Sequence, residues 1–133
     1  MLKKIATRAG VIAATTALAA LSVAGAAEAK PGVGYIGYGK TNNTHAVWCV
    51  QHQYNYLVRV NGPSHPQIAE DGKFGPQTDE AIRFLQKYWW GDSGTDGIVG
   101  PATGGLFLTL GDPVYGTVAG EKGYCYDYIP SYT

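Results

Sequence analysis

The sequence predicts an all-α domain: a small three-helix bundle with an irregular N-terminal lead-in and a C-terminal tail tethered by a disulfide. Three segments place apolar residues at spacings of three and four, as the buried face of a helix requires. An eight-residue motif occurs twice, 25 residues apart, and the chain holds two cysteines. Helices joined by short connections favour a bundle around a single core.

Residues 1–29 have the layout of an export signal. A short basic start precedes an apolar run from Ala9 to about Val23, and Ala27-Glu28-Ala29 fits the small-x-small pattern of a cleavage site. We expect cleavage after Ala29, with cleavage after Ala26 as the alternative. A membrane anchor is less favoured, because the apolar run is shorter than the roughly 20 residues that a spanning helix needs.

The exported part, residues 30–133, has 104 residues, which is enough for one compact domain and leaves no room for a second, catalytic one. It carries about two more acidic than basic side chains. It therefore lacks the basic face with which nucleic-acid-binding proteins neutralise phosphates. We expect a secreted protein, extracellular or associated with the cell wall, that has no membrane partner after signal cleavage.

Residues 30–45 are rich in glycine, asparagine and threonine and show no helical period, which is typical of a flexible lead-in. The first helix is predicted from Ala46 to about Val60. It ends before Gly62-Pro63 and His65-Pro66, because proline disfavours helical backbone in the residue that precedes it. Its apolar stripe consists of Val47, Val50, Tyr54 and Leu57.

The repeated motif predicts the starts of two further helices. Asp-Gly favours a turn, and proline presets the first helical residue. The glycine before each proline is expected to take a cap conformation that is closed to other residues. The two copies are Asp71-Gly72-Lys73-Phe74-Gly75-Pro76-Gln77-Thr78 and Asp96-Gly97-Ile98-Val99-Gly100-Pro101-Ala102-Thr103.

An apolar stripe follows each copy of the motif. The third helix is the weaker one, because Gly104 and Gly105 each cost up to about 1 kcal/mol relative to alanine. Packing against the rest of the domain must therefore hold it. The predicted core consists of Val47, Val50, Tyr54, Leu57, Ile82, Leu85, Leu106, Phe107 and Leu110.

The tail, residues 111–133, is rich in tyrosine and lacks helical spacing. With two cysteines in an exported chain, a Cys49–Cys125 disulfide is expected to tie the tail to the first helix. Closing a loop of that length stabilises the fold by about 4 kcal/mol in the chain-entropy model. A cysteine nucleophile or metal ligand is less favoured, since neither cysteine has a second partner at ligand spacing.

Val50-Gln51 with Asn55 and Leu57, residues 71–87 and residues 96–103 resemble the peptidoglycan-binding domain found beside many bacterial wall hydrolases. The resemblance covers about residues 46–110, and a doubled motif at fixed spacing is more specific than one Asp-Gly turn. Membership implies a three-helix fold and affinity for the glycan or stem peptide of peptidoglycan. Gly104 departs from the pattern, since the family often has tryptophan there, and the usual hydrolase domain does not accompany this copy.

The repeated residues have a sufficient structural role as helix-start residues, which we favour over direct ligand contact. Sugar rings and short peptides are usually held by flat aromatic faces with a few polar groups. Trp90 is expected to be exposed, because Trp89 continues the buried stripe. Trp48 either shares a ligand-binding face with polar neighbours or packs under the tyrosine-rich tail. The candidate ligand-binding residues are Trp48, Gln51, Asn55, Asp71, Gly72, Phe74, Thr78, Trp90, Asp96 and Gly97.

No catalytic site, metal or cofactor is expected. The three histidines form no His-Glu-x-x-His pair, and no pair of carboxylates stands out as acid and base. Residues 92–97 faintly resemble a calcium loop, but Gly94 and Thr103 stand where ligands are required. The sequence therefore predicts a non-catalytic wall-binding module. The alternatives are a module that docks onto or inhibits a separate wall hydrolase and, less favoured, a minimal wall hydrolase.

Overall fold

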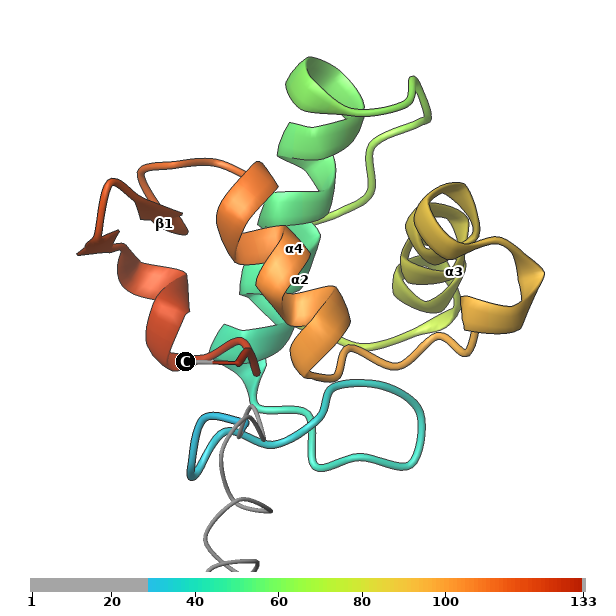
Figure 1. Cartoon of the computed structure of the whole chain (residues 1–133). Helices are drawn as coiled ribbons and strands as arrows, with labels where there is room; N and C mark the ends of the chain where they lie inside the picture. Colours follow the sequence, from blue (N-terminus) through green and yellow to red (C-terminus); the bar gives the residue numbers. More distant parts are fainter. Residues whose placement is uncertain (1–28, 133) are drawn as a thin grey trace, which may run out of the picture.

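The computed structural model describes residues 29–132, so the predicted export signal lies outside the described residues except for Ala29. The described chain is mostly helical, as predicted, but not purely all-α, because the tail contains a small antiparallel sheet (Figure 1). The elements are α2 (Thr44–Tyr56), the π-helical turn η1 (Leu57–Asn61), α3 (Pro76–Trp90), η2 (Asp92–Gly94), α4 (Pro101–Leu110), β1 (Thr117–Val118), β2 (Glu121–Lys122) and η3 (Tyr124–Asp127).

Helix α2 is central to the arrangement and contacts α3, α4 and η3. In Figure 1 the red tail lies on one side of α2 and α4, and α3 lies on the other. The blue lead-in crosses below the start of α2, close to the end of the tail. The lead-in and the tail therefore meet at one end of the helical layer.

Local residues set where each helix starts. Asn43 caps α2, because its Oδ1 accepts hydrogen bonds from the backbone N–H groups of His45 (2.9 Å) and Ala46 (3.2 Å). Pro76 and Pro101 stand at the first positions of α3 and α4, as the repeated motif predicts.

The glycines that adopt left-handed backbone in the motif are not the ones expected. Gly75 and Gly100 have extended backbone, with φ of −142° and −97°, which other residues adopt equally well. The expectation of a special cap conformation there is therefore wrong. Gly72 and Gly97 are left-handed instead, with φ of +71° and +75°. The turn is made at the Asp-Gly step, where glycine is the residue that tolerates positive φ.

Most of the predicted core is confirmed, since all its members in α2, η1 and α3 are buried, as is Phe107. The stripe of α4 needs correction: Leu106 and Leu110 are half-buried, whereas Leu108 is 2% exposed. The cause is the tail, which covers the face of α4 that Gly104 shares with Leu108 one turn later. A Cβ atom at Gly104 would lie 1.8 Å from the Pro130 carbonyl oxygen.

Residues outside the helices complete the core. Ile36 of the lead-in and Ile129 of the tail are both fully buried. Ile36 pairs with Val99, and each backbone N–H donates to the other's carbonyl oxygen, at 3.1 and 2.8 Å. Residues 30–45, expected to be a flexible lead-in, are thus anchored to the second copy of the motif.

The Cys49–Cys125 disulfide joins α2 to η3, as predicted from the cysteine count. Both cysteines are fully buried, and the bond spans 76 residues of sequence. Such a bond is compatible with an extracellular location. Within residues 29–132, none of the helices has the length and apolar character of a membrane span.

Candidate binding site

A buried glutamine closes the turn of the first motif copy. Gln51 of α2 is 1% exposed, and its Nε2 donates hydrogen bonds to Asp71 Oδ1 (3.0 Å), the Lys73 carbonyl (3.1 Å) and Thr78 Oγ1 (3.0 Å). Its Oε1 accepts from the Gly72 backbone N–H at 2.8 Å. All the polar atoms of this amide are therefore used inside the turn.

Gln86 of α3 closes the second copy in the same way. Its Nε2 donates to Asp96 Oδ1 (3.0 Å), the Ile98 carbonyl (2.9 Å) and Thr103 Oγ1 (3.2 Å), and its Oε1 accepts from the Gly97 N–H at 2.8 Å. The repeated Asp, Gly and Thr letters are thus the partners of a glutamine on the preceding helix. Sequence reasoning missed Gln86. The signal that could have found it is the pair Val50-Gln51 and Leu85-Gln86, in which each glutamine follows a buried apolar residue.

Six of the predicted ligand-binding residues take part in these contacts: Gln51 from α2, and Asp71, Gly72, Thr78, Asp96 and Gly97 from the two motif copies. Gly72 and Thr78 are buried, while Asp71 is exposed at its edge. The Lys73 backbone N–H and the Gln51 amide both donate to the Asp71 carboxylate and hold its pKa below the usual value. These bonds agree with the favoured structural role of the repeated residues.

Each motif copy also borders a pocket. The pocket beside the second copy has a volume of about 280 Å³ and that beside the first about 220 Å³. Gln86 lines the former and Gln51 the latter. The other seven residues that line the first pocket each have a counterpart 25 residues later that lines the second pocket. These pairs are Ala69 and Gly94, Asp71 and Asp96, Lys73 and Ile98, Gly75 and Gly100, Pro76 and Pro101, Gln77 and Ala102, and Thr78 and Thr103.

Of the two motif pockets, the one beside the second copy is lined by aromatic side chains among the described residues, and we call it the aromatic pocket. Tyr35 of the lead-in, Trp90 at the end of α3 and Tyr132 of the tail line it, and they are 49%, 41% and 53% exposed. Two glycines let the rings lie against the backbone: a Cβ atom at Gly94 would lie 2.5 Å from Trp90 Cβ, and one at Gly100 would lie 3.3 Å from the Tyr35 ring. Three separate segments thus bring flat aromatic faces to one pocket.

The aromatic pocket also offers unpaired polar atoms. Asp96 Oδ1 accepts hydrogen bonds from the Gln86 amide and the Ile98 N–H, which leaves Oδ2 free among the described residues. Tyr35 and Tyr132 bring hydroxyl groups to the same pocket, and Trp90 brings an indole N–H. Among the described residues, no lysine or arginine lines the pocket. The arrangement therefore disfavours an anionic ligand and suits one with apolar faces and hydroxyl or amide groups.

The remaining predicted residues lie outside both pockets. Trp48 is half-buried, stacks on His52 (ring centroids 4.9 Å apart) and meets Tyr115 and Tyr124 edge-on, which is the alternative in which it packs under the tail. Asn55 is buried and bonded to the backbone of residue 68. Phe74 is half-buried against Tyr38.

Tyr35 and Tyr132 are the site residues that the sequence did not indicate. Both stand in segments without helical period, where no pattern predicts which way a side chain points. Trp90, by contrast, is exposed as predicted.

No family model matches this chain. The comparisons with curated proteins and with solved structures give no significant match either. In the part of the chain that the structure describes, no group of three or more histidine, cysteine, aspartate or glutamate side chains is placed to hold a metal ion.

Proposed function

We propose that this chain is a secreted, non-catalytic module that binds the glycan of bacterial cell-wall peptidoglycan in the aromatic pocket. The observation that carries the proposal is the convergence of Tyr35, Trp90 and Tyr132 on one pocket. A sugar ring has apolar C–H faces and a polar rim, so flat aromatic walls with a few hydrogen-bonding groups suit it.

The polar groups of the pocket support the same ligand class. Asp96 Oδ2 is an acceptor for a sugar hydroxyl or an N-acetyl N–H, and the indole N–H of Trp90 is a donor. Because no basic side chain of residues 29–132 lines the pocket, it favours a neutral sugar over a phosphorylated or nucleic-acid ligand. The resemblance of the doubled motif to peptidoglycan-binding domains and the export signal point to the wall as the source of the glycan.

The lining also supports binding without hydrolysis. Glycosidases commonly place two carboxyl groups on either side of the bond that they break. Among the described residues, Asp96 is the single carboxylate that lines the aromatic pocket. A bound glycan would therefore meet one acceptor and no second carboxylate to act as its catalytic partner.

Co-sedimentation with purified, insoluble peptidoglycan tests the proposal, with cellulose as the control polymer. We expect oxidised residues 30–133 to pellet with peptidoglycan and not with cellulose. The Y35A/W90A double variant should bind at least about tenfold more weakly, since aromatic anchors each contribute on the order of 1 kcal/mol or more. Far-UV circular dichroism checks that the variant keeps its helices.

The matched control is Y38A/Y88A. It removes two exposed aromatic side chains from the same two segments, neither of which lines the aromatic pocket. Equal retention of both double variants would show that the pocket is not the binding site. A wild-type protein that stays in the supernatant would instead favour docking onto another protein.

A further inference from the structure

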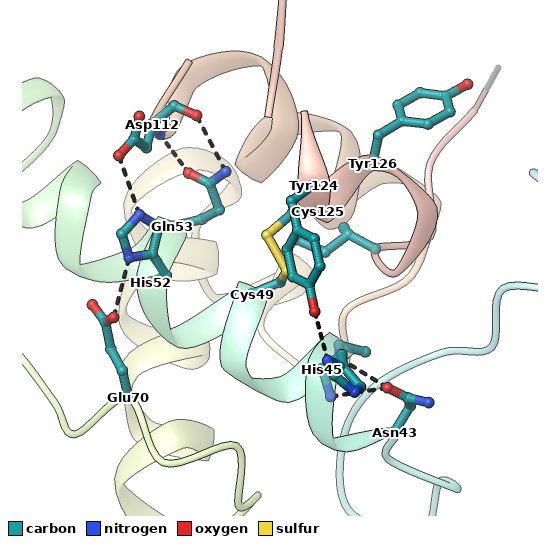
Figure 2. The surroundings of a disulfide bond; sticks show 12 residues. Asn43, His45, Cys49, His52, Gln53, Glu70, Asp112, Tyr124, Cys125 and Tyr126 are labelled. Carbon is teal, nitrogen blue, oxygen red and sulfur yellow. Dashed lines mark hydrogen bonds and ion pairs between the residues drawn. A yellow bond between two sulfur atoms is a disulfide. The ribbon is translucent and has the colours of Figure 1, made fainter. Parts of the chain in front are cut away.

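His52 of α2 lies between two carboxylates that come from different parts of the chain. Its Nδ1 is 3.1 Å from Glu70 Oε2, in the extended segment before α3, and its Nε2 is 3.1 Å from Asp112 Oδ2, just after α4. Figure 2 shows the ring bridging the two groups. The side chains of His52 and Asp112 are 19% and 18% exposed, and that of Glu70 is 31% exposed.

Other contacts hold both carboxylates in place. Asn55 donates to Glu70 Oε1 at 3.0 Å. The Val114 N–H donates to Asp112 Oδ1 at 2.9 Å, and the Asp112 backbone N–H donates to the Gln53 side chain (Figure 2). These contacts orient both carboxylates toward the imidazole.

The number of N–H groups on the imidazole decides which protonation state of His52 fits this geometry. Ionised carboxylates only accept hydrogen bonds, and a neutral imidazole has a single N–H. In the neutral ring, one nitrogen lone pair would face a carboxylate oxygen at 3.1 Å. The imidazolium donates from both nitrogens and satisfies both partners with charge-assisted bonds.

The aromatic neighbours favour the same state. The Trp48 ring lies parallel to the imidazole, 10° between planes, and its face attracts a cation. The Tyr115 ring meets the imidazole edge-on, with centroids 4.5 Å apart. Among the described residues, the titratable groups that face His52 are therefore Glu70, from the segment before α3, and Asp112 and Tyr115, from the segment after α4.

We propose that His52 is a proton-operated clamp. Its imidazolium ties the segment before α3 and the segment after α4 to α2, and loss of its proton loosens both. Histidine is the side chain that most readily serves as a proton-operated switch in proteins. Ala69 and Asp71, on either side of Glu70, line the pocket of the first motif copy, so the clamp controls one wall of that pocket.

Nitrogen-15 NMR of the oxidised protein measures the protonation state of His52 directly. At pH 6 we expect both ring nitrogens of His52 to give the chemical shift of a protonated imidazolium nitrogen. As the pH rises to 8, the protection of amides against exchange, taken relative to the intrinsic exchange rate at each pH, should fall in residues 67–71 and 112–116 and not in α3. A neutral His52 at pH 6, or protection that falls evenly along the chain, would overturn the proposal.

Thermal unfolding of matched variants supplies the second measurement. Between pH 6 and 8, the Tm of the wild type should fall by about 5 °C more than that of H52Q, because the variant has no proton to lose. E70Q should also lose this pH dependence, since its amide donates to a neutral imidazole. H45Q, which changes an exposed histidine on the same helix, should behave as the wild type. Parallel pH curves for the wild type, H52Q and E70Q would refute the clamp.

Discussion

At the scale of single residues, Gln51 and Gln86 explain why the motif recurs. Each amide binds an aspartate, a threonine, a carbonyl oxygen and a glycine N–H of one turn. Removing such an amide leaves several buried polar groups without partners, and each of these costs about 1–3 kcal/mol. The repeated residues are thus held in place by Gln51 and Gln86, which lie outside the repeat.

The variant Gln86→Ala tests this role. We expect its free energy of unfolding to fall by about 3 kcal/mol, because the Gly97 N–H, the Ile98 carbonyl and Thr103 lose their buried partner. Denaturant-induced unfolding followed by circular dichroism measures the difference. Gln77→Ala, which removes an exposed glutamine from the same helix, should stay within about 0.5 kcal/mol of the wild type. Equal values for the two variants would contradict the role of Gln86.

The sequence predicted the exposed Trp90 and the prolines that begin α3 and α4, because turn chemistry and helical period are local properties. It did not predict Gln86, since a glutamine on an amphipathic helix looks like any solvent-facing polar residue. Nor did the sequence predict that Tyr35 and Tyr132 line the pocket. Their position depends on where the lead-in and the tail dock, and that is set by contacts distant in sequence.

At the scale of elements, the tail determines how α4 is buried. The period of α4 alone favours Leu106 and Leu110 as core residues, and the structure buries Leu108 in their place. Gly104 leaves room for the Pro130 carbonyl, because it has no Cβ atom. The tail thus occupies space beside α4 that any larger side chain at this position would need.

Gly104→Ala and Gly105→Ala form a matched pair on adjacent positions of α4. The first should lower the free energy of unfolding by about 2–3 kcal/mol, because its Cβ would overlap the Pro130 carbonyl. The second has open space around its Cβ and should raise stability by up to about 1 kcal/mol through helix propensity. Denaturant unfolding measures both. A Gly104→Ala protein as stable as Gly105→Ala would show that the tail is not packed against α4.

At the scale of the whole molecule, segments without regular structure complete a core that three helices alone leave open. Ile36 and Ile129 are as deeply buried as the helical core residues. The sequence predicted the three helices and the disulfide, since periodicity and the cysteine count are sufficient for both. It did not predict the anchored lead-in or the β1–β2 hairpin, because both depend on tertiary contacts.

Replacing Cys49 and Cys125 by alanine together tests how much the molecule depends on its cross-link. The loop between them spans 76 residues, so its loss should lower the free energy of unfolding by about 4 kcal/mol in the chain-entropy model. Unfolding of the double variant should match that of the wild type under reducing conditions. A loss below about 1 kcal/mol would mean that packing alone holds the tail.

The pairing of the two ends of the described chain bears on how the protein can be engineered. Ala29 and Tyr132 form an antiparallel bridge, and the Lys30 N–H donates to the Ser131 carbonyl at 2.9 Å. A short linker can therefore join these ends in a circular permutant, with new termini in the stretch 62–64 after η1. Figure 1 places that stretch at the opposite end of α2. An affinity tag or surface tether fused there leaves the aromatic pocket open, whereas one fused after Tyr132 sits at its mouth.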